Sequence, residues 1–205
     1  MTEEVTTESL ETDTSCESKE SRFKKPENLP QTILISIIGG LLFVLLDAIW
    51  WPHTTIGFFK FGFAPSLALV AAVGGVRGSL AGFLTGYIGK LLSDIILSGG
   101  IIAFSLYGVA IGFLGLVVGI AGYNLIQGRS LAKLSIMSAI GLVFTALLIV
   151  VFGLFVEGVA VIVAIGFQLI PTLTVGLPTV ILLTPLFARL WHAAIPSPIE
   201  TESSK

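Results

Sequence analysis

The long central part of this chain is almost free of acidic side chains, and this feature most limits what it can fold into. Between Gln31 and Trp191 the only acids are Asp47, Asp94 and Glu157. Only 12% of all residues are charged and the mean hydropathy is +0.98, whereas an ordinary soluble domain carries about 25% charged residues. We therefore expect a multi-pass protein of the cell membrane.

The two ends of the chain differ sharply from this central part. Eight of the 13 acids lie in residues 1–29, which contain too few apolar side chains to form a core. We predict a disordered acidic cytoplasmic tail at 1–29, a membrane domain at 30–192 and a short polar tail at 193–205. No apolar segment begins the chain, so no cleavable secretory signal is expected. Cys16 is the single cysteine, which excludes an intramolecular disulfide and a cysteine-based metal site.

Apolar runs predict an all-α membrane protein with six transmembrane helices, because a span needs about 20 apolar residues. The predicted spans are 31–50, 61–76, 79–97, 101–125, 131–155 and 173–191. Residues 157–170 are apolar but short, which favours an interfacial or re-entrant helix, with part of a seventh span as the alternative. Pro171 is expected to start the last span, and Pro178 and Pro185 to kink it. Nearby threonines are expected to bond some of the released carbonyls; they are Thr172, Thr174, Thr179 and Thr184.

The basic residues favour six spans and set the orientation. With six spans, Arg77, Arg129, Lys133 and Arg189 share the side of the basic N-terminal flank, while Lys60 lies opposite. The positive-inside rule then places both termini in the cytoplasm. Nearly all polar side chains of the membrane part then gather toward the outer face, as an outward-facing pocket for a polar solute would require.

A stripe of small and charged residues begins at the turn before the predicted helix 79–97. Gly78, Gly82, Gly86, Lys90 and Asp94 follow one another at steps of four, so they share one slowly turning helix face. The glycines allow another helix to approach closely, and the two charges belong in the outer half of the membrane. Ionisable groups at that depth mark a pathway or ligand site, or form an ion pair that only locks helices together.

A second glycine pattern occupies the predicted span 101–125. Its members are Gly108, Gly112, Gly115, Gly119 and Gly122. The alternating spacings of four and three place them on one face, which predicts tight packing against a neighbouring helix.

Motifs of nucleotide hydrolysis, zinc hydrolysis and serine hydrolysis are absent from the sequence. It contains no G-x-x-x-x-G-K-[ST], no H-E-x-x-H and no G-x-S-x-G, and its two histidines lie far apart. We therefore expect no enzymatic activity, no cofactor, no metal and no nucleic-acid partner.

The run from Ala64-Pro65-Ser66-Leu67 through Gly74-Gly75-Val76-Arg77-Gly78 continues to Gly82, Gly86 and Asp94. Over residues 31–191 this pattern resembles the substrate-binding S component of an energy-coupling factor (ECF) transporter. The resemblance implies a six-helix protein that captures a vitamin or related micronutrient from outside. It also implies partners, namely a transmembrane coupling subunit and two cytoplasmic ATPases that hydrolyse the ATP.

In this family the first span often carries an Ala-x-x-x-Ala pair for docking to the coupling subunit. This chain has Ser36-x-x-x-Gly40 instead, with Gly39 beside it. Small residues allow similarly close packing, so Ser36, Gly39 and Gly40 are the predicted docking residues.

The predicted substrate site combines aromatic walls with a few charged groups, as small-molecule sites commonly do. Its residues are Trp50, Trp51, Lys60, Lys90, Asp94 and Glu157. The tryptophans would cap the solute and the charged groups would orient it. Two alternatives stay open: a stand-alone secondary transporter or channel with Lys90 and Asp94 in an ion relay, and a non-transport scaffold whose outer charges only pair with each other.

Overall fold

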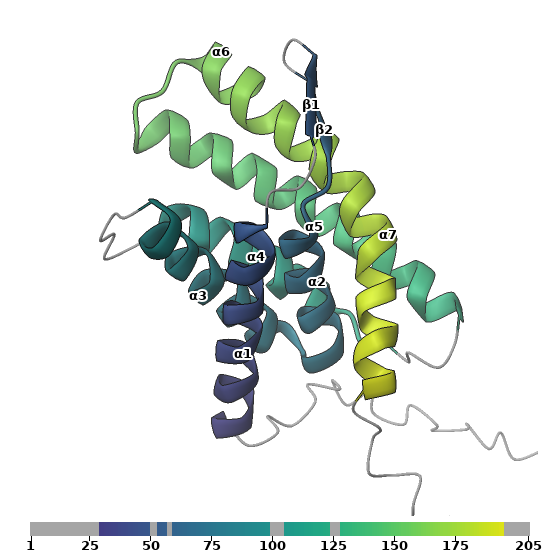
Figure 1. Cartoon of the computed structure of the whole chain (residues 1–205). Coiled ribbons are helices and arrows are strands. Elements are labelled where there is room, and N and C mark those ends of the chain that lie inside the picture. The colour runs from purple at the N-terminus through teal and green to yellow at the C-terminus, as the bar shows by residue number, and fades with distance from the viewer. Residues whose placement is uncertain (1–28, 50–52, 57–58, 99–104, 124–127, 195–205) are drawn as a thin grey trace, which may run out of the picture.

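The computed structural model describes residues 29–49, 53–56, 59–98, 105–123 and 128–194. It contains a helical bundle with one short antiparallel β-hairpin, β1 (His53–Ile56) and β2 (Phe59–Gly62). The helices are α1 (Leu29–Ala48), α2 (Pro65–Arg77), α3 (Ser79–Ser98), α4 (Leu106–Ile120), α5 (Gly128–Phe155), α6 (Val161–Val163) and α7 (Ile170–Ala194), with a π-helix (Ala164–Leu169) before α7. Figure 1 shows α5 and the α6–α7 run side by side, extending beyond the shorter helices.

Four helical segments are long and apolar enough to cross a membrane: α1, α3, α5 and the continuous run Val161–Trp191. This finding confirms a helical protein with segments of membrane-spanning length. In contrast, α2 and α4 have 13 and 15 residues. At about 1.5 Å per residue they measure roughly 20 and 22 Å, less than a hydrocarbon core of about 30 Å. The count of six spans stays a prediction.

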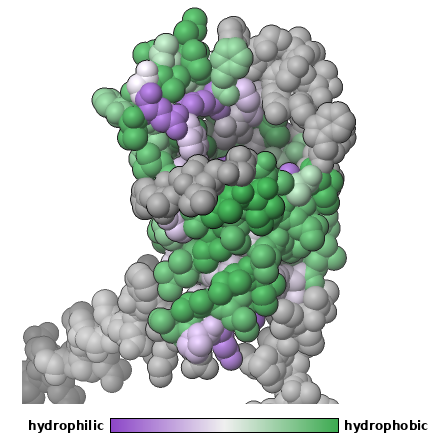
Figure 2. Space-filling view, turned by 60° about the vertical axis from the view of Figure 1, so that its left-hand side comes forward, coloured by the Kyte–Doolittle hydropathy of each residue, from purple (hydrophilic) through white to green (hydrophobic). Residues whose placement is uncertain are grey.

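Side chains at the described surface are largely apolar. Figure 2 shows hydrophobic residues across most of one face, with hydrophilic residues toward its two ends. Exposed leucines and isoleucines follow α1 along its length; they include Ile33, Leu34, Ile37, Ile38, Leu41 and Leu45. Such a surface suits contact with lipid or with another apolar helix.

The predicted span 61–76 begins too early. Phe61 and Gly62 belong to β2, where Phe61 pairs with Thr54 of β1. The helix starts at Pro65, because proline lacks an N–H and its fixed φ suits the first helical turn. It ends before Gly78, whose φ of 100° favours glycine and turns the chain directly into α3. The predicted turn at this site is therefore confirmed.

Glycines bring α2, α3 and α4 into backbone contact. A Cβ added at Gly115 of α4 would overlap the backbone of Gly82 of α3, and one at Gly82 would lie 2.6 Å from the Cα of Gly74 of α2. Gly112 and Gly119 likewise face α3 at Phe83 and Ser79. The predicted glycine face of α4 is thus confirmed at these positions.

The last member of that glycine series does not take part in the packing. α4 ends at Ile120, so Gly122 lies beyond the helix, and nothing lies within 4 Å of a Cβ added there. The predicted span 101–125 is therefore too long at its C-terminal end.

Residues 157–170 do not form a separate re-entrant or interfacial helix. From Val161 the chain is helical without a break to Ala194, so most of this segment is the first part of the last helix. Pro171 does not start that helix, contrary to the prediction. The wider π-helical turn before it, in which the Ile170 N–H donates to the Ile165 carbonyl, accommodates a residue that lacks an N–H.

Three threonines near the prolines of α7 bond backbone carbonyls. The hydroxyls of Thr172, Thr174 and Thr179 bond carbonyls one turn earlier in their own helix, at Gln168, Ile170 and Val175. These are not the carbonyls that the prolines release. The Ile181 carbonyl, which Pro185 leaves without its helical donor, accepts a hydrogen bond of 3.0 Å from Ser135 of α5.

Candidate functional site

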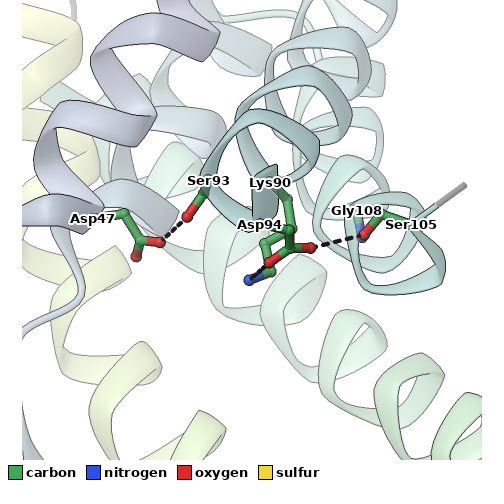
Figure 3. Close-up of polar contacts among 6 residues, drawn as sticks. All are labelled: Asp47, Lys90, Ser93, Asp94, Ser105 and Gly108. Atoms are coloured by element: carbon green, nitrogen blue, oxygen red, sulfur yellow. Dashed lines mark hydrogen bonds and ion pairs between the residues drawn. The ribbon is translucent and has the colours of Figure 1, made fainter. Parts of the chain in front are cut away.

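An ion pair on α3 lies at the centre of the polar residues (Figure 3). Lys90 Nζ is 2.6 Å from Asp94 Oδ1, and the two side chains are 26% and 14% exposed. Residues four apart on a helix are neighbours, so one helical turn suffices to bring the charges together. The sequence predicted this pairing, and the structure brings the two residues together.

The second oxygen of Asp94 faces the start of α4. Asp94 Oδ2 accepts a hydrogen bond of 3.3 Å from the hydroxyl of Ser105. The same hydroxyl oxygen accepts a bond of 2.9 Å from the Gly108 N–H, which makes Ser105 the N-cap of α4. The Asp94 carboxylate therefore lies where the partial positive charge of a helix N-terminus favours an anion.

A second carboxylate joins the same end of α3 from α1. The hydroxyl of Ser93, which is only 2% exposed, donates to Asp47 Oδ2. Asp47 itself is exposed. Because Ser93 and Asp94 are consecutive, α3 reaches α1 through one residue and α4 through the next (Figure 3).

Glu157 connects to this end of the bundle through a tyrosine. The hydroxyl of Tyr107 donates to Glu157 Oε2 at 2.9 Å, and Gln168 Nε2 donates to the Tyr107 oxygen at 3.1 Å. Tyr107 follows Ser105 by two residues, so the first turn of α4 is bonded to both acids. The buried Gln168 Oε1 has no hydrogen-bond partner among the described residues.

These contacts define the polar cluster, a set of side chains around the start of α4. Its members are Asp47, Lys90, Ser93, Asp94, Ser105, Tyr107, Glu157 and Gln168. Lys90, Asp94 and Glu157 were predicted, and Asp47 was recognised as one of three acids in the membrane part. Ser105 was missed, although a serine immediately before an apolar helix is a recognisable capping signal. Tyr107 and Gln168 were missed because no local pattern marks them.

Other predicted site residues are placed only in part. Lys60 pairs with Thr55 in the β-hairpin, and its side chain lies outside the described part of the structure. Trp50 and Trp51 also lie outside the described residues. The segment after the hairpin is fastened to α7, because the Ala64 N–H donates to the hydroxyl of Thr179 at 3.1 Å.

The predicted docking residues of α1 are covered by the chain itself. Ser36 is fully buried and its hydroxyl lies 2.8 Å from the Thr32 carbonyl and 3.3 Å from that of Ala81 on α3. A Cβ added at Gly39 would lie 2.9 Å from the methyl of Thr85, and Gly40 is similarly close to Ile88. In this conformation these small residues pack α1 against α3, and an external helix has no access to them.

The polar cluster offers binding groups of both charges. An ammonium group has three donors, so Lys90 keeps donors beyond the one that Asp94 uses. Among the described residues no group of three or more His, Cys, Asp or Glu side chains could hold a metal ion. A hollow lined by Leu131, Ser135 and Arg189 lies at the other end of α5 and includes none of the predicted substrate-binding residues.

Comparisons with known proteins found no match to this chain, whether to a family model, a curated protein or a solved structure.

Proposed function

We propose that this chain captures a small polar solute at the polar cluster. In this proposal it is the substrate-binding component of an ECF-type importer, with six membrane spans, cytoplasmic termini and a vitamin or related micronutrient as its solute. The observation that carries the proposal is the arrangement of Lys90, Asp94 and Ser105, which places opposite charges and a helix N-terminus together at the end of an apolar bundle. Charged groups in such surroundings mark binding sites or pathways.

The chemistry of the cluster suits a solute with both an anionic group and a hydrogen-bond donor. A carboxylate or phosphate of the solute would bind the remaining donors of Lys90. A donor group would bind Glu157, whose exposed carboxylate accepts only the Tyr107 bond among the described contacts. Trp50, Trp51 and Lys60 would close the site from the hairpin side. No covalent bond of the solute would be formed or broken. The partner ATPases would drive the release of the solute.

The burial of Ser36, Gly39 and Gly40 restricts how a coupling subunit would bind. Docking through these residues requires α1 to move away from α3. Such a movement would also separate Asp47 from Ser93, because that hydrogen bond joins the same two helices. In the proposed cycle, docking on α1 and opening of the polar cluster are therefore coupled.

A second candidate function is a non-transport scaffold in the membrane. The observation that favours it is the ion pair, since the charges of Lys90 and Asp94 already compensate each other. In a scaffold the polar cluster would only hold α1, α3 and α4 together and would bind nothing.

Native mass spectrometry of the gently solubilised protein separates the two functions. A retained vitamin-like molecule at one per chain, identified after denaturation, is expected for a capture subunit. Lys90→Ala should weaken its binding at least tenfold, because it removes the cation that would bind the anionic group of the solute. Asp94→Ala should also weaken it, because it removes the carboxylate that holds Lys90 in place. Lys133→Ala is the matched control, since it removes a positive charge at the other end of the bundle. Unchanged affinity in both cluster variants, with the protein still folded, would overturn the proposal.

A further inference from the structure

A hollow of about 360 Å³ opens between the start of α5 and the end of α7, away from the polar cluster. Its lining residues are Leu131, Ala132, Ser135, Pro185, Leu186 and Arg189. This volume is at the lower end of the range for small-molecule sites, roughly 300 to 1,000 Å³. The hollow is independent of the solute site proposed above, because the two share no residue.

Arg189 supplies the charge of this hollow. Ser135 is the only other polar side chain in the lining. Its hydroxyl has one hydrogen, and its oxygen lies 3.0 Å from the Ile181 carbonyl and 3.3 Å from the Leu131 carbonyl. The hydroxyl therefore has no hydrogen left for a ligand. Arg189 is exposed, and its guanidinium presents five donors in a planar fork that matches phosphate oxygens.

No acidic side chain of the described helices neutralises this arginine. Asp47 lies at the end of α1, Asp94 near the end of α3 and Glu157 beyond the end of α5, all within the polar cluster. Leu131 and Ser135, which line the hollow, lie in the first two turns of α5, at its opposite end. The hollow thus carries a positive charge, and an anionic occupant complements it.

The basic residue closest in sequence to the lining of α5 is already engaged elsewhere. Lys133 Nζ donates to the Gly122 carbonyl at 3.3 Å and lies 5.6 Å from the centre of the Tyr123 ring. Lys133 is next to Ala132 in the chain but is absent from the lining of the hollow. It therefore provides a matched control for the charge of Arg189.

Apolar side chains continue from the hollow onto the outer surface of the two helices. Leu186 is 50% exposed, Leu190 56% and Leu182 64% on α7, and Ile136 is 60% exposed on α5. An occupant that has an anionic head and an apolar chain satisfies both parts of this surface. Basic pockets between membrane helices are a known setting for anionic lipid headgroups.

We propose that the hollow between α5 and α7 binds an anionic glycerophospholipid. Its phosphate is held by Arg189, and an acyl chain lies along Ala132 and Leu186 toward the exposed apolar surface. Arginine binds phosphate through two parallel N–H···O bonds. A zwitterionic headgroup also has a phosphate, but its own cation reduces the attraction to Arg189.

Native mass spectrometry with defined lipids tests this site. The purified full chain is titrated with phosphatidylglycerol and, separately, with phosphatidylcholine in neutral detergent. Phosphatidylglycerol should bind more tightly, and Arg189→Gln should weaken its binding about fivefold. Lys133→Gln should leave it unchanged. Ala132→Leu keeps Arg189 but fills the hollow. It should also weaken lipid binding, because the acyl chain can no longer lie there.

Each contrary result overturns the proposal. Equal losses in Arg189→Gln and Lys133→Gln would show general attraction to a basic surface. Equal binding of the two lipids would show that the net charge of the headgroup does not determine binding. Undiminished lipid binding by Ala132→Leu would show that the lipid does not occupy the hollow. Displacement of the lipid by excess inorganic phosphate would indicate a site for free anions. Ala132 and Arg189 are both exposed, so the variants should fold, as size-exclusion chromatography and circular dichroism would verify.

Discussion

Asp94 of α3 accepts a hydrogen bond from Ser105, the residue that caps the N-terminus of α4. One hydroxyl thus serves two purposes: it donates to the carboxylate and accepts from the Gly108 N–H. The ion pair with Lys90 is thereby attached to a second helix, although both of its charges come from α3.

Replacing Ser105 tests this double role. Ser105→Ala should lower the free energy of unfolding by about 1 kcal/mol, because it removes the cap of α4 and one bond to Asp94. Ser105→Thr keeps a hydroxyl at the cap and should recover most of the loss. Unfolding by sodium dodecyl sulfate in mixed detergent micelles measures both. A threonine variant as unstable as the alanine variant would contradict the capping role.

Gly82 and Gly115, which are in contact, should be among the positions of the fold that tolerate substitution least. Gly115→Ala places a methyl group against the backbone of α3, which side-chain movement cannot relieve. Overpacking of this kind lowers stability by about 1 to 3 kcal/mol. The expected result is a lower midpoint of thermal unfolding in detergent.

Gly122→Ala is the control for the glycine contact. A Cβ added at Gly122 meets nothing within 4 Å, and this glycine has no positive φ. Its substitution should change stability by less than about 0.5 kcal/mol. Equal effects at Gly115 and Gly122 would mean that the close approach of α3 and α4 is not what makes glycine necessary.

Ser135 and Pro185 should be energetically coupled, although they lie on different helices. Ser135→Ala leaves the Ile181 carbonyl without its donor and should lower stability by about 1 kcal/mol. In the background of Pro185→Ala, the restored N–H of residue 185 can bond that carbonyl within the helix. The serine substitution should then have little effect. A double-mutant cycle on the free energy of unfolding measures the coupling, and additive effects would contradict it.

Removing one member of the Lys90–Asp94 pair should lower the stability of the protein more than removing both. Lys90→Met leaves a partly buried carboxylate without its cation, at a loss of about 1 to 3 kcal/mol. Lys90→Met combined with Asp94→Leu removes both charges and should be closer to the original stability. Thermal unfolding of the ligand-free protein in detergent gives this comparison. A double variant less stable than either single one would show that the pair stabilises the bundle in its own right.

The predictions that the structure confirmed concern residues that lie close together in the sequence. The turn at Gly78, the pairing of Lys90 with Asp94 and the glycine face of α4 all depend on spacings of one to four residues. Helix geometry converts such spacings into a shared face or a shared turn, so no knowledge of the remaining fold was needed.

The incorrect predictions concern segments whose conformation depends on their neighbours. Phe61 was placed in a helix, yet its backbone pairs with Thr54 of β1. Pro171 was expected to start a helix, yet a π-helical turn lets the chain continue through it. An apolar stretch can join a strand, a new helix or an existing helix, and its own composition does not distinguish these outcomes.

By itself the sequence determined that the chain has apolar helices of membrane-spanning length, because charge is nearly absent between Gln31 and Trp191. It also determined which side chains within one helix meet. Only the tertiary structure decided that Ser105 and Tyr107 connect Asp94 with Glu157, and that α3 covers Ser36 and Gly39. Contacts between helices depend on how each helix is rotated and offset against the others. Many residues together set that arrangement, so no local spacing encodes it.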